Sequence, residues 1–445
     1  GTENISTDRY EAEVSYQKKF GQETLLNFSN SYINHNRNAT NDSYLSDYKD
    51  THEGAKPDVL DMRPYLAEEN SLISTLTLGT KAGNHSLLFG LQHYVTRLNE
   101  SGMYVVVDEE NDYYGESYKS IARKHAQEFG FFLQDEWQAA PDFTVVPGVR
   151  IDYHTSGEEY ASDRQIFDSD FPKTAFERTS VNPRLALKYN VGGRVTLRAN
   201  AGTGFRAPYG FSEDLHLCSG SPRVWKSSDL KAETSRSANL SADYYAHHIQ
   251  LSANIFYTYL KDKIDFTDAD EDVKNLGYTY QWRNIDDAVV KGVEMTLLLN
   301  PVKDLNIGTD FSINSGSYKN TREDWRGTPY EGISNKISRF PSTSGSVKIE
   351  YAPHNWNLTI YGLYQGKSYI DYISEVENNS KIKETDPYMT FNASISRTFG
   401  KVRLYAGGKN IFSYIQDERH LDDAAFLYAP VYGALYYAGI SLRIN

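Results

Sequence analysis

The sequence predicts an all-β protein, a transmembrane antiparallel β-barrel, from three observations. Apolar and polar residues alternate in segments of about 10 residues, as they do between 195 and 206. Short and long connections alternate between the segments, which is typical of barrels with tight turns on one side of the membrane. The chain holds 35 Tyr and 20 Phe although its mean hydropathy is −0.59. This combination excludes apolar helices of about 20 residues but not alternating strands.

Composition and charge limit the classes of partner. The chain of 445 residues has a formal net charge of −13 and a pI near 5.4. It carries no basic stripe that could neutralise phosphates along a backbone, so nucleic acid is not an expected partner. Its one cysteine, Cys218, can form no internal disulfide and is expected to be an unpaired loop residue.

From residue 10 onward, hairpins joined by long polar loops are expected. The short turns contain Gly, Asn or paired His, for example Phe20-Gly21-Gln22 and His247-His248. We interpret His247-His248 as a turn and not as a metal site. The expected strand pairs are 10–18 with 23–35, 72–81 with 85–98, 127–138 with 143–153, a pair that turns at 192–193, and 234–245 with 249–266.

The segment 277–299 decides the order of short and long connections. Dividing it at Asp286-Asp287 would place the tight turn at 300–304 on the long-loop side, so one long strand is expected. The strands that follow are expected at 305–317, 338–351, 357–370, 388–399, 402–411 and 432–444.

The strand count implies an incomplete barrel. The total is about 17 strands, whereas plugged transporters close with roughly 22. Residues 1–445 are therefore expected to form one barrel domain that lacks an N-terminal plug and the first strands. Gly1 would then lie in an extracellular loop.

The strand 195–206 shows both faces of the expected wall. A two-residue period places Leu197 and Phe205 on the apolar face, and Arg198 and Arg206 on the polar face. Pro208 ends the strand because it has no N–H for the sheet ladder. In 127–138 the same period gives an apolar face made of Phe129, Phe131, Leu133 and Trp137.

The stretch Phe205-Arg206-Ala207-Pro208 resembles a sequence box of the TonB-dependent outer-membrane receptors. Other segments resemble further parts of that family's barrel, in the family's order. They are FLQDEW at 132–137, PGVRID at 147–152, NPRLA at 182–186, LKAETS at 230–235, KGVE at 291–294 and KNIF at 409–412. The resemblance covers nearly the whole chain as barrel, and nothing in it resembles the family's plug.

The resemblance implies an importer, not an enzyme, in the outer membrane of a Gram-negative bacterium. The expected cargo is a large scarce nutrient: a ferric siderophore, haem or cobalamin. The expected partners are TonB, reached through a plug that is not in this chain, the N-terminal plug and barrel segment, outer-membrane lipid and a surface lipoprotein. The alternative class is a passive, porin-like or adhesive barrel without energy coupling.

Loop residues with flat rings or positive charge are the candidate ligand contacts, because they suit planar or anionic chelates. In the resembled superfamily, haem receptors carry an iron-ligating histidine in the loop where His216 lies. Ser227-Ser228-Asp229-Leu230 departs from their second box, and an ordinary loop histidine is the alternative. For the aromatic candidates the alternative is the ring girdle at the membrane boundary. The other candidates are Arg223, Trp225, Tyr113, Tyr114, Trp325 and Tyr369.

Charged residues on the polar face are the candidates for contact with a plug. They are Arg150, Arg198, Arg206 and Glu294. No cofactor is required by the sequence.

Calcium in an extracellular loop is a separate expectation. Asp268, Asp270 and Asp272 have the alternate spacing that opens a calcium loop. Val273 and Thr279 stand where such a loop has its glycine and its bidentate glutamate, so a solvated acidic loop is the alternative.

Overall fold

The computed structural model describes residues 3–54, 65–106, 109–110, 112–162, 171–209, 224–276, 278, 280–321, 335–338, 340–374, 379–416 and 428–444. Within them the strands form one large sheet and one separate hairpin, with two short helices, α1 (Asp42–Thr51) and α2 (Glu271–Lys274). Neither of these helices is long and apolar enough to cross a membrane.

The large sheet of the described residues holds 18 strands. One of them, β9 (Val224–Lys226), is a short parallel addition to β12, so 17 antiparallel strands remain. The first eight are β1 (Glu3–Phe20), β2 (Thr24–Asn41), β3 (Tyr65–Ala82), β4 (His85–Val105), β5 (Ser117–Ala140), β6 (Phe143–Ser162), β7 (Thr174–Val191) and β8 (Val195–Arg206). The others are β10 (Glu233–Ala246), β11 (Ile249–Asp268), β12 (Tyr280–Leu299), β13 (Leu305–Tyr318), β14 (Thr343–Tyr351), β15 (Trp356–Gln365), β18 (Tyr388–Phe399), β19 (Val402–Lys409) and β20 (Leu435–Leu442).

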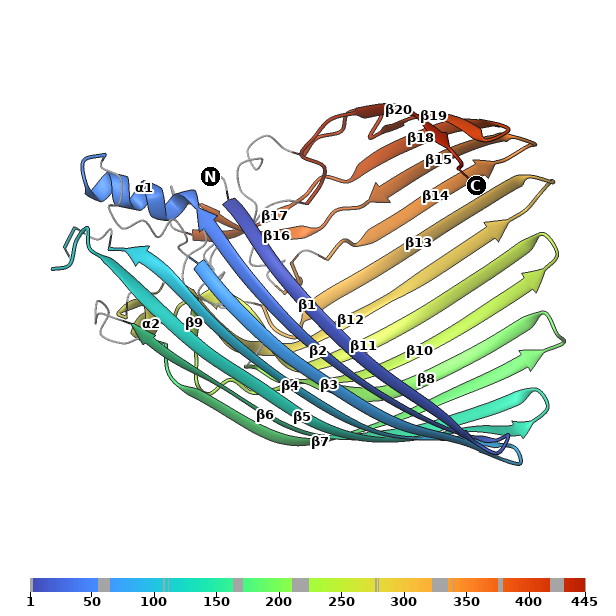
Figure 1. Ribbon diagram of the computed structural model, residues 1–445, viewed down its shortest axis with the longest axis horizontal. Helices are drawn as coiled ribbons and strands as arrows, with labels where there is room; N and C mark the ends of the chain where they lie inside the picture. The colour runs from blue at the N-terminus through green and yellow to red at the C-terminus, as the bar shows by residue number, and fades with distance from the viewer. Residues whose placement is uncertain are drawn as a thin grey trace.

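The turn asymmetry predicted from the sequence is confirmed. Short turns join β1 to β2, β3 to β4, β5 to β6, β7 to β8, β10 to β11, β12 to β13, β14 to β15 and β18 to β19. The intervening connections are long and lie at the opposite end, where both helices are found (Figure 1). The segment 277–299 contributes one strand, β12, as the alternation of short and long connections required.

One expected strand is wrong. Residues 357–370 were expected to form a single strand, but β15 ends at Gln365, and β16 (Tyr369–Ser374) pairs with β17 (Asn379–Glu384) in a separate hairpin. The Gly366 N–H still donates to the Thr343 carbonyl at 2.8 Å, and the Lys367 carbonyl accepts from the Ser342 N–H at 3.0 Å, so the chain leaves the sheet after Lys367. β14 likewise starts at Thr343 and not at 338, because Pro341 has no N–H to donate.

The sheet is open within the described residues. β1 pairs with β2 and β20 pairs with β19, and no pairing connects β1 to β20. The sheet curls so that β1 and β20 are its two edges (Figure 1). An open sheet is what the strand count predicted. Its completion to a barrel of roughly 22 strands stays a prediction.

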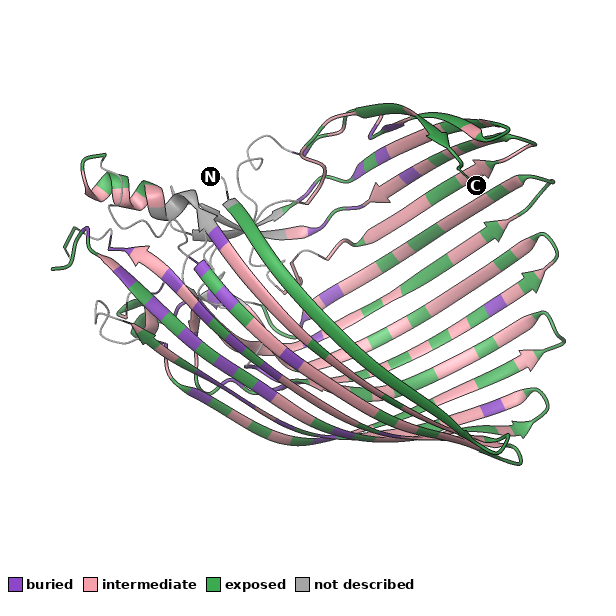
Figure 2. Ribbon diagram, viewed as in Figure 1, coloured by how far each residue is buried: buried purple, intermediate pink, exposed green. Residues whose placement is uncertain are grey.

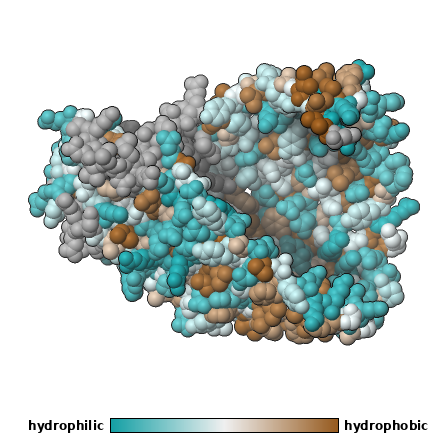
Figure 3. Space-filling view, viewed as in Figure 1, coloured by the Kyte–Doolittle hydropathy of each residue, from teal (hydrophilic) through white to brown (hydrophobic). Residues whose placement is uncertain are grey.

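The register between neighbouring strands aligns apolar residues in a row on the outer face of the sheet. Phe28, Leu76, Leu91, Phe131 and Ile151 are successive partners on β2 to β6, and all are exposed. A row of exposed apolar side chains is the outer surface expected of a transmembrane barrel. In space-filling view apolar surface gathers along the lower rim of the molecule, and the concave interior of the sheet is hollowed (Figure 3).

The buried residues concentrate at the long-loop end of β3 to β6, where buried and exposed positions alternate (Figure 2). The main apolar cluster comprises Ala39, Tyr65, Ala67, Leu98, Ala122, Phe171 and Tyr278. Strands of 18 to 24 residues exceed the 9–11 that cross a bilayer, so these ends extend beyond the membrane. The packed core therefore lies above the membrane, beside the loops.

Candidate functional site

The four residues expected to contact a plug all lie on the inner face. The register between neighbouring strands from β6 to β12 places all four on the same face of the sheet, opposite the exposed apolar rows. Arg198 pairs with Asp243, and Arg206 Nη1 lies 3.2 Å from Glu233 Oε2. Glu294 Oε2 accepts a hydrogen bond of 3.0 Å from Asn254.

Arg150 is the centre of a polar cluster on the inner wall. Its guanidinium lies 2.7 Å from Asp152 Oδ1, and Nη2 donates to Glu128 at 3.0 Å and to Gln92 at 2.9 Å. Gly130 leaves room for it, since a Cβ there would lie 2.5 Å from Nη2 of Arg150. The cluster thus offers a fixed, charged surface to whatever occupies the interior.

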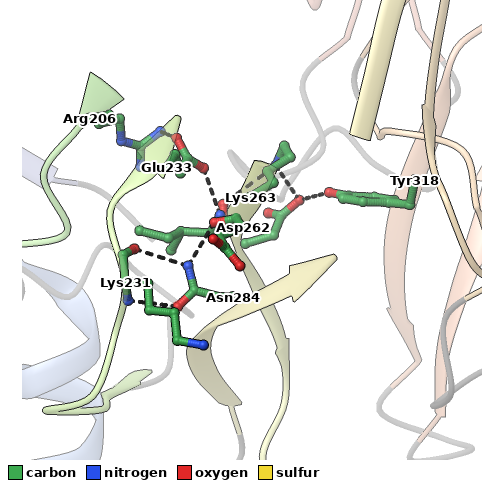
Figure 4. A network of polar contacts seen from close by, with 9 residues as sticks. Arg206, Lys231, Glu233, Asp262, Lys263, Asn284 and Tyr318 are labelled. Atoms are coloured by element: carbon green, nitrogen blue, oxygen red, sulfur yellow. Dashed lines mark hydrogen bonds and ion pairs between the residues drawn. The ribbon is translucent and has the colours of Figure 1, made fainter. Parts of the chain in front are cut away.

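Two sequence boxes meet at the base of the loop that follows β8. Arg206 ends β8 and Glu233 begins β10, and they face one another in the sheet (Figure 4). The Glu233 carboxylate also accepts the backbone N–H of Ile264 at 2.6 Å, at a break in the register of β11. Glu233 is mostly buried, with 8% of its surface exposed. Its carboxylate connects β10 with β8 and β11.

A neighbouring amide extends this junction. Asn284 on β12 accepts the N–H of Lys231 at 2.8 Å and donates to the carbonyl oxygens of Lys231 and Asp262 (Figure 4). Asp262 has a positive φ of 53°, which the register break imposes. These contacts hold the end of the loop to the wall.

Tyr209 fixes the other end of the same loop. Its hydroxyl donates to the Ser227 carbonyl at 2.6 Å and accepts the Leu230 N–H at 2.9 Å. Tyr209 is 1% exposed, and burial raises the pKa of its hydroxyl to about 12. These two hydrogen bonds therefore hold Tyr209, at the start of the loop, to Ser227 and Leu230 near its end.

Trp225, a candidate ligand contact, lies in an aromatic cluster. Its ring centroid is 5.1 Å from that of Tyr278 and 6.1 Å from that of Phe171, and Tyr160 packs 4.8 Å from Phe171. The strand β9 that carries Trp225 runs parallel to the start of β12. Trp225 thus has a packing role that the sequence did not indicate, and contact with a ligand stays a prediction.

Phe205 has neighbours that simple alternation did not predict. Its ring lies 6.1 Å from the buried His154 ring and 5.9 Å from the Arg178 guanidinium carbon. His154 belongs to the inner face of β6, and its Nδ1 lies 3.5 Å from Glu128 Oε2. The Phe205 ring therefore packs beside polar residues of the inner wall and is not simply a lipid-facing side chain.

Two buried ion pairs were missed by sequence reasoning. Lys226 Nζ lies 3.2 Å from Glu158 Oε1, and Lys124 Nζ lies 2.5 Å from Glu100 Oε1. The four side chains are at most 6% exposed. A lysine or glutamate in an alternating strand looks the same whether it faces water or a covered interior, so no sequence signal could have found them.

The remaining ligand candidates divide by position. Tyr113 and Tyr114 are 41% and 40% exposed in the turn before β5, at the long-loop end. Tyr369 starts β16 and is half-buried. The other three, His216, Arg223 and Trp325, lie outside the described residues, as does Cys218.

The acidic loop after β11 has a local structural role. Asp268 ends β11, Asp270 precedes α2 as its N-cap and accepts from Arg283 at 2.7 Å, and Asp272 lies in the first turn of α2. Within the described residues no three His, Cys, Asp or Glu side chains are grouped to hold a metal ion. Calcium binding here stays a prediction.

An antiparallel sheet with an apolar outer face, a polar inner face and all its long loops at one end defines the class of transmembrane β-barrels. The chain belongs to the TonB dependent receptor-like, beta-barrel family, whose model matches residues 1–411. Membership of this family places the chain in the outer membrane.

Curated relatives cover parts of the chain at low identity. The Vitamin B12 transporter BtuB of Photobacterium profundum is 26% identical over 188 residues, which are 42% of this chain and 27% of that protein. The iron-regulated outer membrane virulence protein of Vibrio cholerae is 26% identical over 292 residues, covering 60% and 39%. The ferric enterobactin receptor of Pseudomonas aeruginosa is 25% identical over 312 residues, covering 64% and 37%. The chain thus matches well under half the length of each of these relatives.

Solved structures are similar in fold over nearly the whole chain. The ferric yersiniabactin uptake receptor FyuA from Yersinia pestis gives a TM-score of 0.69 at 14% identity, covering 98% of this chain and 60% of that one. The ferric citrate transporter FecA gives 0.67 at 14% identity, covering 98% and 62%. At 14% sequence identity, the similarity of these two structures to this chain is a similarity of fold.

Proposed function

We propose that this chain forms most of the wall of a TonB-dependent outer-membrane importer for a large scarce nutrient. Ferric siderophore, haem and cobalamin are the candidate cargoes. A ferric siderophore ranks first, because two of the three relatives above carry iron or a ferric ligand in their names. The transporter needs no covalent catalysis and no resident cofactor, since TonB supplies the work through a plug.

The observation that carries the proposal is the path of β9 across the inside of the sheet. β9 pairs with Tyr280–Trp282 of β12, yet Lys226 at its end reaches Glu158 on the inner face of β6. β7, β8, β10 and β11 lie between those two strands in the sheet. A segment that connects β12 with β6 on the inner side covers part of the long-loop end, which favours a gated importer over a porin-like channel.

The inner wall supports a plug as the second component. Arg150, Arg198 and Arg206 already have carboxylate partners on the wall, so a plug would bind these pairs through hydrogen bonds. Glu294 differs, because the described residues give it an amide partner, Asn254, and no ion pair. A basic side chain of the plug is therefore expected opposite Glu294.

The ligand contacts of the proposal lie at the mouth. Tyr113 and Tyr114 present exposed rings beside the loops, and His216, Arg223 and Trp325 are further candidates by sequence position. Loops on a rigid wall can vary in sequence without loss of the scaffold. A surface lipoprotein that covers this mouth is a further proposed partner.

Uptake with and without TonB tests the proposal. The complete gene product should be produced in an outer membrane that lacks other receptors, in strains that contain or lack TonB. Accumulation of one labelled cargo among ferric siderophore, haem and cobalamin is expected in the TonB-containing strain alone. Equal uptake in both strains would instead establish the passive channel, and absence of uptake with retained cell-surface binding would favour the adhesive barrel.

A further inference from the structure

We propose that cargo passes along one part of the inner wall, the inner faces of β13, β14, β15 and β18, while the inner faces of β6, β7 and β8 hold the plug in place. We call the first set of faces the neutral sector and the second the charged sector. The inference rests on the proposed function, because it requires that TonB pulls on a plug inside this wall. It adds which part of the wall separates from the plug.

The charged sector carries many ionised groups that face the interior. The register places its cations on one face of the sheet: Arg150, Arg178, Arg184, Lys188, Arg198 and Arg206. Its carboxylates are Asp152 and Glu158, and the adjoining inner faces of β5 and β10 add Glu128, Glu136, Glu233 and Asp243. Arg184 and Lys188 are exposed, so a partner inside the wall can reach them. A plug on this sector forms charge-assisted hydrogen bonds, which are about twice as strong as neutral ones.

The neutral sector presents hydroxyl and amide groups instead. On β13 the inward residues Ser312 and Asn314 alternate with Phe311 and Ile313, which are exposed on the outer face. The four strands of this sector lie side by side (Figure 1). One row of successive cross-strand partners on their inner faces consists of Ser312, Ser344, Gln365 and Tyr388. None of these side chains is ionised at pH 7.

The polar groups of the neutral sector form hydrogen bonds with one another. Ser312 Oγ lies 2.7 Å from Ser344 Oγ, and the Tyr388 hydroxyl donates to Gln365 Oε1 at 3.1 Å. A partner that leaves this surface therefore leaves no unpaired charge behind. Because a plug holds to neutral groups more weakly than to ionised ones, a pulled plug separates from the neutral sector first.

The few charged residues of the neutral sector have partners within the wall. Among the inward residues of its four strands, all of which the structure describes, the charged ones are Asp310, Lys348 and Glu350. Asp310 accepts hydrogen bonds from Thr296 at 2.9 Å and from Ser346 at 3.0 Å. Lys348 Nζ lies 3.3 Å from Glu350 Oε2. Cargo on this path therefore meets a series of weak contacts, and passage through a pore requires contacts that are weak enough to leave.

Accessibility of single cysteines in the complete gene product tests the inference. C218S removes the one cysteine of this chain, and S312C and S394C then place a thiol in the neutral sector. The matched controls are N200C, on the inner face of β8, and S241C, at the cross-strand partner of Arg198. Cells with and without TonB receive ferric enterobactin, haem and cobalamin together and are labelled with fluorescein maleimide. With TonB, the labelling rate of S312C and S394C is expected to rise about fivefold or more, while that of N200C and S241C stays within about twofold.

Uptake measured in the same cells separates this inference from the proposed function. Where uptake depends on TonB, three labelling results would overturn the inference alone: an equal rise in both sectors, a rise only at N200C and S241C, or no rise at any position. Equal uptake with and without TonB would overturn both. A variant that does not reach the uptake of the C218S parent is replaced by a neighbour on the same face, N314C for S312C and N392C for S394C.

Discussion

Arg206 Nη1 lies 3.2 Å from Glu233 Oε2, and this contact joins two sequence boxes that the loop 209–232 separates along the chain. Because β8 and β10 are neighbours, the last residue of β8 faces the first residue of β10. Glu233 also holds the N–H of Ile264, so the pair stabilises the junction of three strands where the loop leaves the wall. The boxes therefore have a structural explanation in addition to their family resemblance.

Removing the Glu233 side chain is expected to weaken this junction. The variant E233A leaves the Ile264 N–H without its acceptor and should lower the free energy of unfolding by about 1–3 kcal/mol. E233Q keeps an acceptor oxygen and should lose less. E294A is the matched control on the exposed inner wall and should cost about 0.5 kcal/mol or less. Urea unfolding in micelles, followed by tryptophan fluorescence, measures all three, and an equal effect in E233A and E294A would contradict the role of Glu233.

The buried pair Lys226–Glu158 is expected to be strongly coupled. K226M leaves the Glu158 carboxylate buried beside an apolar side chain and should cost about 3–5 kcal/mol. K226M/E158Q removes both charges and should recover a large part of that loss. K173A, which breaks the exposed Lys173–Glu159 pair on the outer face, should cost about 0–1 kcal/mol. A double-mutant cycle with a coupling near zero would show that the pair does not hold β9 to β6.

Gly90 is expected to tolerate no larger side chain while Phe132 is present. A Cβ at Gly90 would lie 1.9 Å from Phe132 Cζ, so G90A should force the ring away and cost about 1–3 kcal/mol. G79A on the preceding strand is the control, because nothing lies within 4 Å of a Cβ there. The double variant G90A/F132L should regain part of the loss. Equal melting temperatures for G90A and G79A would show that the ring moves without cost.

Stability at high pH is expected to depend on Tyr209. Its pKa of about 12 exceeds the ordinary value near 10, so the contribution of the neutral hydroxyl is complete below pH 10 and is lost as the pH rises from about 10 to 12. Y209F should therefore cost about 1–3 kcal/mol at pH 8 through its two lost hydrogen bonds. The difference between parent and Y209F should shrink above pH 10, while the other tyrosines titrate in both proteins. A difference that stays constant with pH would place the Tyr209 hydroxyl in water.

The sequence by itself determined the class of fold and the sides of the wall. The two-residue period in strands such as 127–138 and 195–206 requires a sheet with one apolar and one polar face, because successive side chains point to opposite sides. The alternation of short and long connections fixed the direction of each strand. It also predicted that the segment 277–299, which contains β12, forms one strand and not two. Both are local properties, so they could be read without knowing which strands are neighbours.

Only the tertiary structure decided which residues share a site. The contact between Arg206 and Glu233 depends on the register between β8 and β10, and the contact between Lys226 and Glu158 depends on the position of β9 inside the sheet. Trp225 shows the same limit, since a tryptophan in a polar loop has the same sequence signature whether it contacts a ligand or packs on Tyr278. Burial is a property of the assembled sheet, because a polar side chain on the inner face is buried only when another segment folds over it.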